Sequence, residues 1–199
     1  MKTTAPIIKN AVLLDKAIGD IQKGLAGTIG WLDVVFGRAQ RLTRVVNGKT
    51  YKEPHVYAGG TEYAKGNNHN DYICVSPDSK IGNFAFFSIG EPHRIAPFNR
   101  GIENRIKTPF ALIVWVDLRK VYDDVANRNT EALKQDLLRE LNGGFLHPAC
   151  RYTLNAIYEQ SENVYKGYML DESTNQYLMH PYWACRIEGE LSYKEPCYE

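Results

Sequence analysis

The most apolar stretch of the chain, FALIVWVDL at residues 110–118, constrains the fold more than any other segment. It consists largely of β-branched, leucine and aromatic side chains. A continuous apolar run of this kind is typical of a strand whose two faces are both covered. We therefore expect this segment to be the central strand of a sheet and the other elements to cover it.

Two helices are expected, separated by a run of strands. Apolar residues three and four positions apart predict an amphipathic helix at about 6–24, which Gly24 and Gly27 end. A second helix is predicted from Thr130, its cap, to a left-handed stop that begins at Asn142. Because helices and single strands do not alternate, the expected fold class is α+β, with a mainly antiparallel sheet flanked by the N-terminal helix and the second helix near residues 130–142.

The remaining strands are predicted from alternating or β-branched patterns bounded by turn residues. Asn47-Gly48 is the strongest hairpin signal in the chain. In the last strand, apolar residues alternate with polar ones such as Arg186 and Ser192, which predicts an antiparallel strand with one exposed face. The expected strands are 28–36 with a continuation over 41–46, 50–58, 72–75, 83–89, 151–158 with an extension near 164–170, and 182–193.

Length and charge limit the classes of protein to which the chain can belong. A chain of 199 residues with 44% hydrophobic residues is most simply one domain over 1–199, here with long polar loops near 59–70 and 90–108. Its 24 basic and 23 acidic residues give a net charge of +1, which provides no global field for wrapping nucleic acid or coating a membrane. Charged residues interrupt the apolar N-terminal stretch, so neither a signal peptide nor a membrane span is expected.

No constellation of residues indicates catalysis or metal binding. The four cysteines, at 74, 150, 185 and 197, form no CxxC or CxxH pair, so we expect free thiols in a reducing cytoplasm and no metal or cofactor. Nucleotide-binding, metalloprotease and serine-hydrolase motifs are missing. The five histidines, at 55, 69, 93, 147 and 180, stand singly. A weak metal site at His69 and a catalytic Cys150–His147 pair are the less favoured interpretations. Asp123-Asp124 is read as an exposed turn. We therefore do not expect an enzyme.

The near-neutral total hides segments of opposite charge. Residues 37–52 contain only basic charges and residues 94–107 are mostly basic, whereas residues 171–199 are mostly acidic. One reading is an ordinary solvated surface. The other is head-to-tail self-association, in which a basic face of one subunit meets an acidic face of the next and the contacts close into a ring. The candidate interface residues are Arg38, Arg41, Arg44, Glu188 and Glu190, and abundant tyrosine would supply further contact material.

The order of elements resembles a family of bacteriophage proteins. The resemblance rests on the helical segment IIKNAVLLDKAI, the central strand and helix FALIVWVDLRKVY and TEALKQDLLREL, and the closing strand PYWACRIEGELSY followed by EPC. This arrangement is similar to the neck and tail-completion proteins of tailed phages, the tail-terminator-like family, particularly in phages and prophages of Bacteroides-type hosts. Relative to that family, the loops at 59–70 and 90–108 are insertions.

The resemblance implies a non-enzymatic virion component with no cofactor. Such subunits form a ring, commonly sixfold, which caps the tail tube and joins it to the head. The implied partners are other copies of the chain, other neck and tail-tube proteins, and DNA in the lumen, with no membrane; the implied locations are the host cytoplasm before assembly and then the virion. If residues 90–108 face the lumen, Arg94, Arg100, Arg105 and Lys107 are the candidate contacts to DNA phosphates; the equal alternative for this segment is an interface with another protein.

Two other functions stay open at this point. The first is a binding module that holds a carbohydrate or a peptide with Tyr-rich loops. The second is an enzyme that uses Asp or His side chains on the loops, which is the least favoured reading because no catalytic constellation is present.

Overall fold

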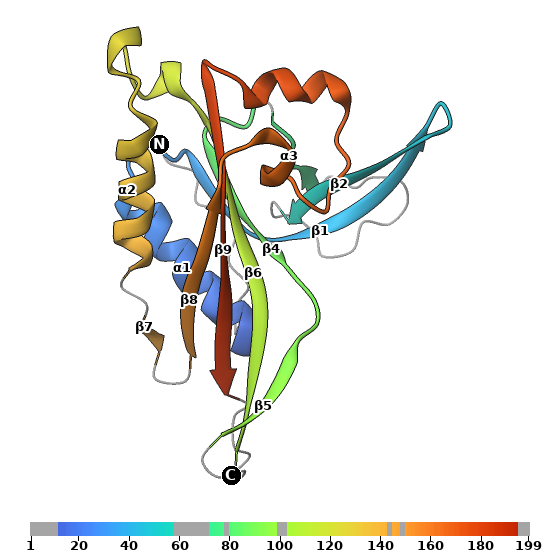
Figure 1. The fold of residues 1–199 in the computed structure, drawn as a ribbon, viewed down its shortest axis with the longest axis vertical. Coiled ribbons are helices and arrows are strands. Elements are labelled where there is room, and N and C mark those ends of the chain that lie inside the picture. Colours follow the sequence, from blue (N-terminus) through green and yellow to red (C-terminus); the bar gives the residue numbers. More distant parts are fainter. Residues whose placement is uncertain are drawn as a thin grey trace.

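The computed structural model describes residues 12–57, 72–77, 80–98, 103–142, 145–147 and 150–194. Within these ranges, nine strands form one sheet in the order β3-β2-β1-β4-β6-β9-β8-β7, and β5 pairs with β6 beside β4 (Figure 1). Strands β1 and β4 run parallel, and the other paired strands run antiparallel. The α+β class with a mainly antiparallel sheet is therefore confirmed.

The bounds of the elements agree with most of the predicted positions. The strands are β1 (Val34–Val46), β2 (Lys49–Tyr57), β3 (Tyr72–Cys74), β4 (Phe84–Ile89), β5 (Arg94–Phe98), β6 (Glu103–Asp117), β7 (Phe145–His147), β8 (Cys150–Tyr158) and β9 (Tyr182–Lys194). The α-helices are α1 (Leu13–Thr28), α2 (Thr130–Leu141) and α3 (Ser161–Val164), and short 3-10 helices are η2 (Leu118–Lys120), η3 (Val125–Asn127) and η4 (Glu172–Leu178).

Strand β6 is the central strand, as its apolar run predicts. It pairs with β9 from Asp117, opposite Tyr182, to Arg105, opposite Lys194. Residues 110–116 are buried throughout, which confirms that both faces are covered there. The alternation predicted for β9 is also confirmed, because its apolar residues are buried and the intervening polar residues are partly exposed.

One face of the sheet packs against α1 and α2. Helix α1 contributes a buried stripe that lies behind the strands in Figure 1, and α2 packs beside it. Since α1 contains Gly19, it depends on this packing rather than on helix propensity alone. The core on this side includes Leu14, Ile18, Ile21, Leu25, Leu133, Leu137, Leu141, Leu112, Val114, Cys185 and Ile187.

The opposite face of the sheet is covered by aromatic side chains from the segment that contains α3 and η4. The Phe84 and Trp115 rings stack with centroids 5.6 Å apart, and Trp115 stacks on Tyr182 at 5.3 Å. The indole Nε1 of Trp115 donates to the main-chain oxygen of Tyr177 at 2.7 Å. This aromatic cluster is a second core, in which Tyr165 is buried and Tyr177 and Tyr182 are partly buried.

Both helix predictions need correction at their ends. Val12 has an extended backbone, so α1 begins at Leu13, and it continues through Gly24 and Gly27 to Thr28. Residues 6–11 of the predicted helix lie outside the described residues. A Cβ at Gly24 would lie 2.8 Å from a carboxylate oxygen of Glu140 on α2, the flexible end of a side chain that can move aside. The cap of α2 is Asn129, whose side chain accepts from the backbone of Ala132, rather than Thr130.

Three segments differ from the predicted strands and loops. Residues 28–33 end α1 and form a turn, so the first strand starts at Val34. The segment 164–170 contains the end of α3 and a turn, with a single bridge from Met169 to Lys52. The loop predicted at 90–108 is instead largely β5 and the beginning of β6. The predicted loop at 59–70 lies outside the described residues.

The Asn47-Gly48 turn and the Asp123-Asp124 turn are confirmed. Asn47 and Gly48 have positive φ angles of 51° and 76°, as a tight hairpin requires, and they connect Val46 directly to Lys49. Asp124 caps η3 by accepting from the backbone of Ala126. Among the described helices, none is long and apolar enough to cross a membrane.

Gly189 is expected to be essential for the β8-β9-β6 packing. A Cβ at this position would overlap the main-chain oxygen of Thr153 and lie 2.7 Å from the Phe110 ring. Gly189→Ala should therefore destabilise the protein by about 1–3 kcal/mol in urea unfolding followed by circular dichroism. The matched control is Gly27→Ala, where no atom lies within 4 Å and the gain in helix propensity should stabilise by about 0.5–1 kcal/mol. Equal effects of the two substitutions would contradict this account.

Candidate functional site

A sheet face that no layer of the described residues covers forms the first candidate site. Segment 161–178, with α3 and η4, covers this face only at the end that is uppermost in Figure 1, and β6, β9 and β5 continue past it. Residues paired across antiparallel strands share a face. The register therefore places Arg94 beside Lys107 and Lys107 beside Ser192, with Arg105 and Lys194 in the next row. We call these residues, together with Arg151, Glu188 and Glu190, the open face.

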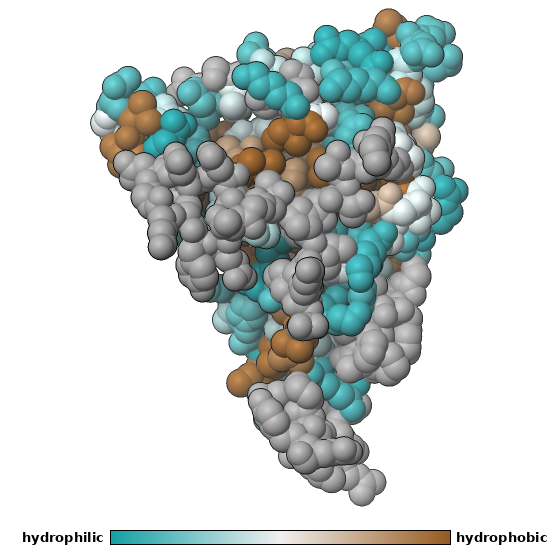
Figure 2. Space-filling model, turned by 180° about the vertical axis from the view of Figure 1, so that it is seen from behind, coloured by the Kyte–Doolittle hydropathy of each residue, from teal (hydrophilic) through white to brown (hydrophobic). Residues whose placement is uncertain are grey.

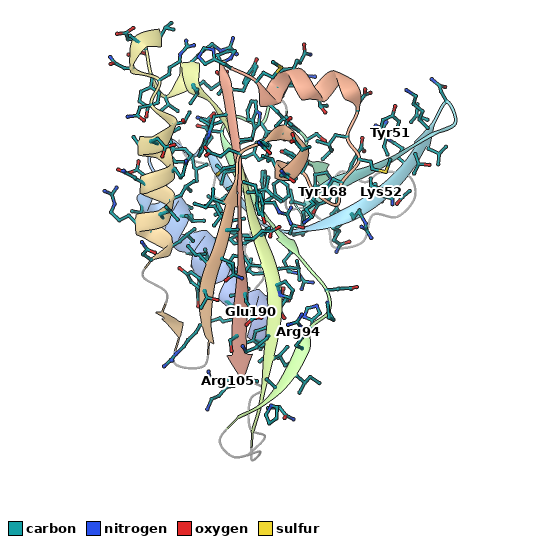
Figure 3. All side chains as sticks on the ribbon, viewed as in Figure 1. Tyr51, Lys52, Arg94, Arg105, Tyr168 and Glu190 are labelled. Atoms are coloured by element: carbon teal, nitrogen blue, oxygen red, sulfur yellow. The ribbon has the colours of Figure 1, made fainter. Side chains whose placement is uncertain are left out.

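The open face carries more basic than acidic side chains. The Nζ of Lys107 lies 3.1 Å from Oε1 of Glu190, and the Nε of Arg186 donates to Glu188 at 2.7 Å. Figure 3 shows Arg94, Arg105 and Glu190 along this part of the sheet. Arg186 neutralises Glu188, so Glu190 is the remaining carboxylate among the described side chains of the open face. The basic residues of this face number five: Arg94, Arg105, Lys107, Arg151 and Lys194.

The structure brings together most of the predicted DNA contacts. Arg94, Arg105 and Lys107, predicted to lie on a loop, lie on the open face instead, on β5 and β6. Arg100 lies outside the described residues. These strands were not predicted because Pro97 and the basic residues obscure the alternation of apolar and polar positions. Edge strands such as β5 nevertheless tolerate proline.

A projecting hairpin forms the second candidate site. Residues 40–51, the outer part of β1 and β2, extend away from the body of the molecule; we call this segment the arm (Figure 1). Every residue from 40 to 50 is exposed, and the exposed side chains include Leu42 at 50% and Val45 at 67%. In Figure 2, which shows the molecule from behind, the projection at upper left carries hydrophobic residues among hydrophilic ones.

The predicted interface residues mostly have partners within the chain. Arg38 binds Asp15 of α1 at 2.9 Å, and Arg44 binds Glu53 at 2.6 Å. Glu188 and Glu190 pair with Arg186 and Lys107, as described above. Arg41 is exposed at the base of the arm, on the face directed toward Tyr168. The described structure thus leaves the predicted contact between a basic and an acidic face as a prediction.

A cluster that the sequence did not reveal lies next to the arm. The side chains of Glu53 and His55 on β2 and Cys74 on β3 place a carboxylate oxygen, a ring nitrogen and a sulfur within 4.8 Å of one another. His55 lies directly opposite Cys74, and Glu53 follows the alternation of β2 onto the same face. All three residues are half-buried, and burial raises the pKa of the Cys74 thiol. The signal that could have revealed this cluster is the Glu-x-His spacing in a predicted strand.

The other cysteine and histidine predictions have mixed outcomes. Cys74 and Cys185 are free thiols, as predicted. His69 and Cys197 lie outside the described residues, as do the side chains of His147 and Cys150.

Comparisons with known proteins add no assignment. No protein-family model matches the chain, and no curated protein matches its sequence. The candidate sites are therefore argued from their own residues.

Tyr165 ties the aromatic cluster to the strand that carries Cys74. Its ring is buried, and its hydroxyl donates to the main-chain oxygen of Val75 at 3.2 Å. Tyr165→Phe removes the donor from a buried carbonyl and should cost about 1–2 kcal/mol in chemical unfolding. Tyr168→Phe, which loses a half-exposed contact with Ser88, is the matched control and should cost less. An equal or larger cost for Tyr168→Phe would count against this role.

Proposed function

We propose that this chain is a non-enzymatic structural subunit that assembles into a ring in the neck or tail end of a tailed bacteriophage. The observation that carries the proposal is the arm, which exposes apolar and basic side chains along a projecting hairpin. A two-stranded hairpin is only marginally stable by itself in water. Exposed apolar residues on such a segment are typical of a contact with another protein.

The arm offers both of its faces to a partner. Successive residues of a strand point to opposite sides, so Leu42 and Val45 lie on different faces of the hairpin. A neighbouring subunit that received the arm would bury the exposed part of both side chains, 50% of Leu42 and 67% of Val45, for about 1–2 kcal/mol each. A contact between an arm and a different surface of the next subunit is head-to-tail, and such contacts form rings when the rotation closes.

The fold is consistent with the sequence resemblance on which the phage assignment rests. The matching segments contain the first turns of α1 (residues 13–18), residues 110–117 of β6, all of α2 and residues 182–193 of β9. These four elements pack together, since residues from all of them belong to one core. The segments that carry the resemblance thus form one structural unit. Of the two insertions relative to that family, residues 90–108 contain β5 and the beginning of β6, and residues 59–70 lie outside the described residues.

The open face supports a contact with DNA inside such a ring. Arginine and lysine bind phosphates without reading the base sequence, as a channel for any DNA requires. The alternative function, a module that binds carbohydrate or peptide through Tyr-rich loops, gains less support. The tyrosines of segment 161–182 are instead packed with Phe84, Phe86 and Trp115.

The arm can be tested by placing charges on its apolar residues. Leu42→Asp combined with Val45→Asp should leave the monomer folded, because both side chains are exposed, and should shift rings to monomers in mass photometry and negative-stain microscopy. The control is Val125→Asp, which changes a residue that is 64% exposed on η3. Rings that persist in the double variant would exclude the arm as the interface, and monomers at every concentration of the unmodified protein would contradict self-assembly.

The contact with DNA can be tested through its salt dependence. Replacing Arg94, Arg105 and Lys107 with glutamine should weaken binding to duplexes of any sequence. The slope of log K against log salt should decrease in magnitude by about 0.9 for each lost phosphate contact, as measured by fluorescence anisotropy. The control replaces Lys120, Arg128 and Arg139 with glutamine, which changes the net charge equally at other positions. Equal losses in both variants, or an unchanged slope, would contradict a specific role for the open face.

A further inference from the structure

Glu53, His55 and Cys74 together have the composition of a transition-metal site. Thiolate sulfur, imidazole nitrogen and carboxylate oxygen are all ligands of Zn²⁺, whereas Mg²⁺ and Ca²⁺ prefer oxygen alone. The three ligand atoms lie within 4.8 Å of one another. Tetrahedral zinc with ordinary bond lengths requires roughly 3.3–3.6 Å between ligand atoms. Side-chain rotations that move the ligand atoms by about 1 Å would therefore bring all three within bonding distance of one ion, without a change in the backbone register.

The backbone holds the three ligands on one face of a two-stranded ladder. His55 pairs with Cys74, and the flanking pairs Val56 with Ile73 and Tyr57 with Tyr72 fix this register. Val75 extends the attachment, because its backbone nitrogen donates to the Pro54 oxygen at 2.9 Å. The ligand set is thus positioned by main-chain bonds on both sides.

A neighbouring hydroxyl suits the sulfur as a metal ligand. The Oγ of Ser76 lies 2.9 Å from Sγ of Cys74. When Cys74 binds a metal it does so as the thiolate, and its proton passes to the solvent. The Ser76 hydroxyl then donates to the sulfur, as groups around metal ligands commonly do.

Arg44 competes with a cation for the same carboxylate. Its Nη2 lies 2.6 Å from Oε1 of Glu53, and its side chain is 54% exposed at the arm. A metal ion that takes Glu53 would displace this guanidinium into the solvent. Metal binding and the charge presented by the arm are therefore linked through one carboxylate.

We propose that Glu53, His55 and Cys74 bind one Zn²⁺ ion, with a water molecule as the fourth ligand, and that Arg44 occupies Glu53 when the ion is absent. The ion would fasten β3, a strand of three residues, to β2. It would also release Arg44 on the arm for contacts with a partner. This metal site goes beyond the assembly role proposed above and does not depend on it.

The site can be tested with Co²⁺ and Zn²⁺ on the full-length chain. Co²⁺ should bind in a 1:1 ratio and give a thiolate-to-cobalt charge-transfer band, and Zn²⁺ should displace it. Cys74→Ser should abolish the band, and His55→Gln or Glu53→Gln should weaken Zn²⁺ binding at least tenfold in competition with a chromophoric chelator. The controls Cys197→Ser and His180→Gln should leave binding unchanged. A band that survives in Cys74→Ser, or no Co²⁺ binding at all, would overturn the proposal.

Arg44→Gln gives a second, opposite test. This exposed side chain can be replaced without disturbing the core, so the result does not depend on whether the ligand variants fold. Removal of the competing guanidinium should tighten Zn²⁺ binding several-fold, and Arg44→Lys should retain part of the competition. Unchanged or weaker binding in Arg44→Gln would refute the competition between Arg44 and the metal. Measurements on the Leu42→Asp, Val45→Asp monomer separate metal binding from assembly.

Discussion

The antiparallel pairing of β6 with β9 is the constraint on which the rest of the structure depends. Along its covered half, alternate residues of the two strands belong to two separate cores. Val114 and its partner Cys185 face α1 and α2, whereas Trp115 and its partner Ala184 face the aromatic cluster. A slip of β9 by one residue would turn Arg186 and its partner Glu188 toward the helices, where both charges would be buried in an apolar core. The cost of that burial fixes the register, and the register places every other strand.

The candidate sites exist because the strands are longer than the layers that cover them. Strands β6 and β9 continue past α3 and η4, which leaves the open face. Strands β1 and β2 continue past the aromatic cluster as the arm. In both places the side chains change from apolar to basic where the cover ends, with Leu42 and Val45 as apolar exceptions on the arm. A strand that extends beyond its covering layers is normally kept from pairing with other chains by charged side chains, or it is covered by a partner.

Sequence patterns correctly predicted the elements that depend on residues close together in the sequence. The apolar run of β6, the Asn47-Gly48 turn and the alternation of β9 each depend on neighbours in sequence, and each is confirmed. The predictions that are wrong depend on distant contacts. Helix α1 continues through Gly24 because its buried stripe extends to Leu25, which packs in the core shared with α2 and the sheet. The residues of the proposed metal site could not be grouped from the sequence for the same reason, since Cys74 lies next to the two β2 residues only through the pairing of β3 with β2.

Ion pairs within the fold limit how much the charged residues can contribute to the affinity between subunits. Basic and acidic segments, separate in the sequence, are partly neutralised within the fold by pairs such as Lys107 with Glu190 and Arg38 with Asp15. Half-exposed pairs of this kind contribute about 0–1 kcal/mol, and exchanging them for pairs between subunits gains little. Burial of the exposed part of Leu42 or Val45 contributes about 1–2 kcal/mol each. The affinity between subunits should therefore come mainly from the apolar residues of the arm, while the charges around them set orientation and salt dependence.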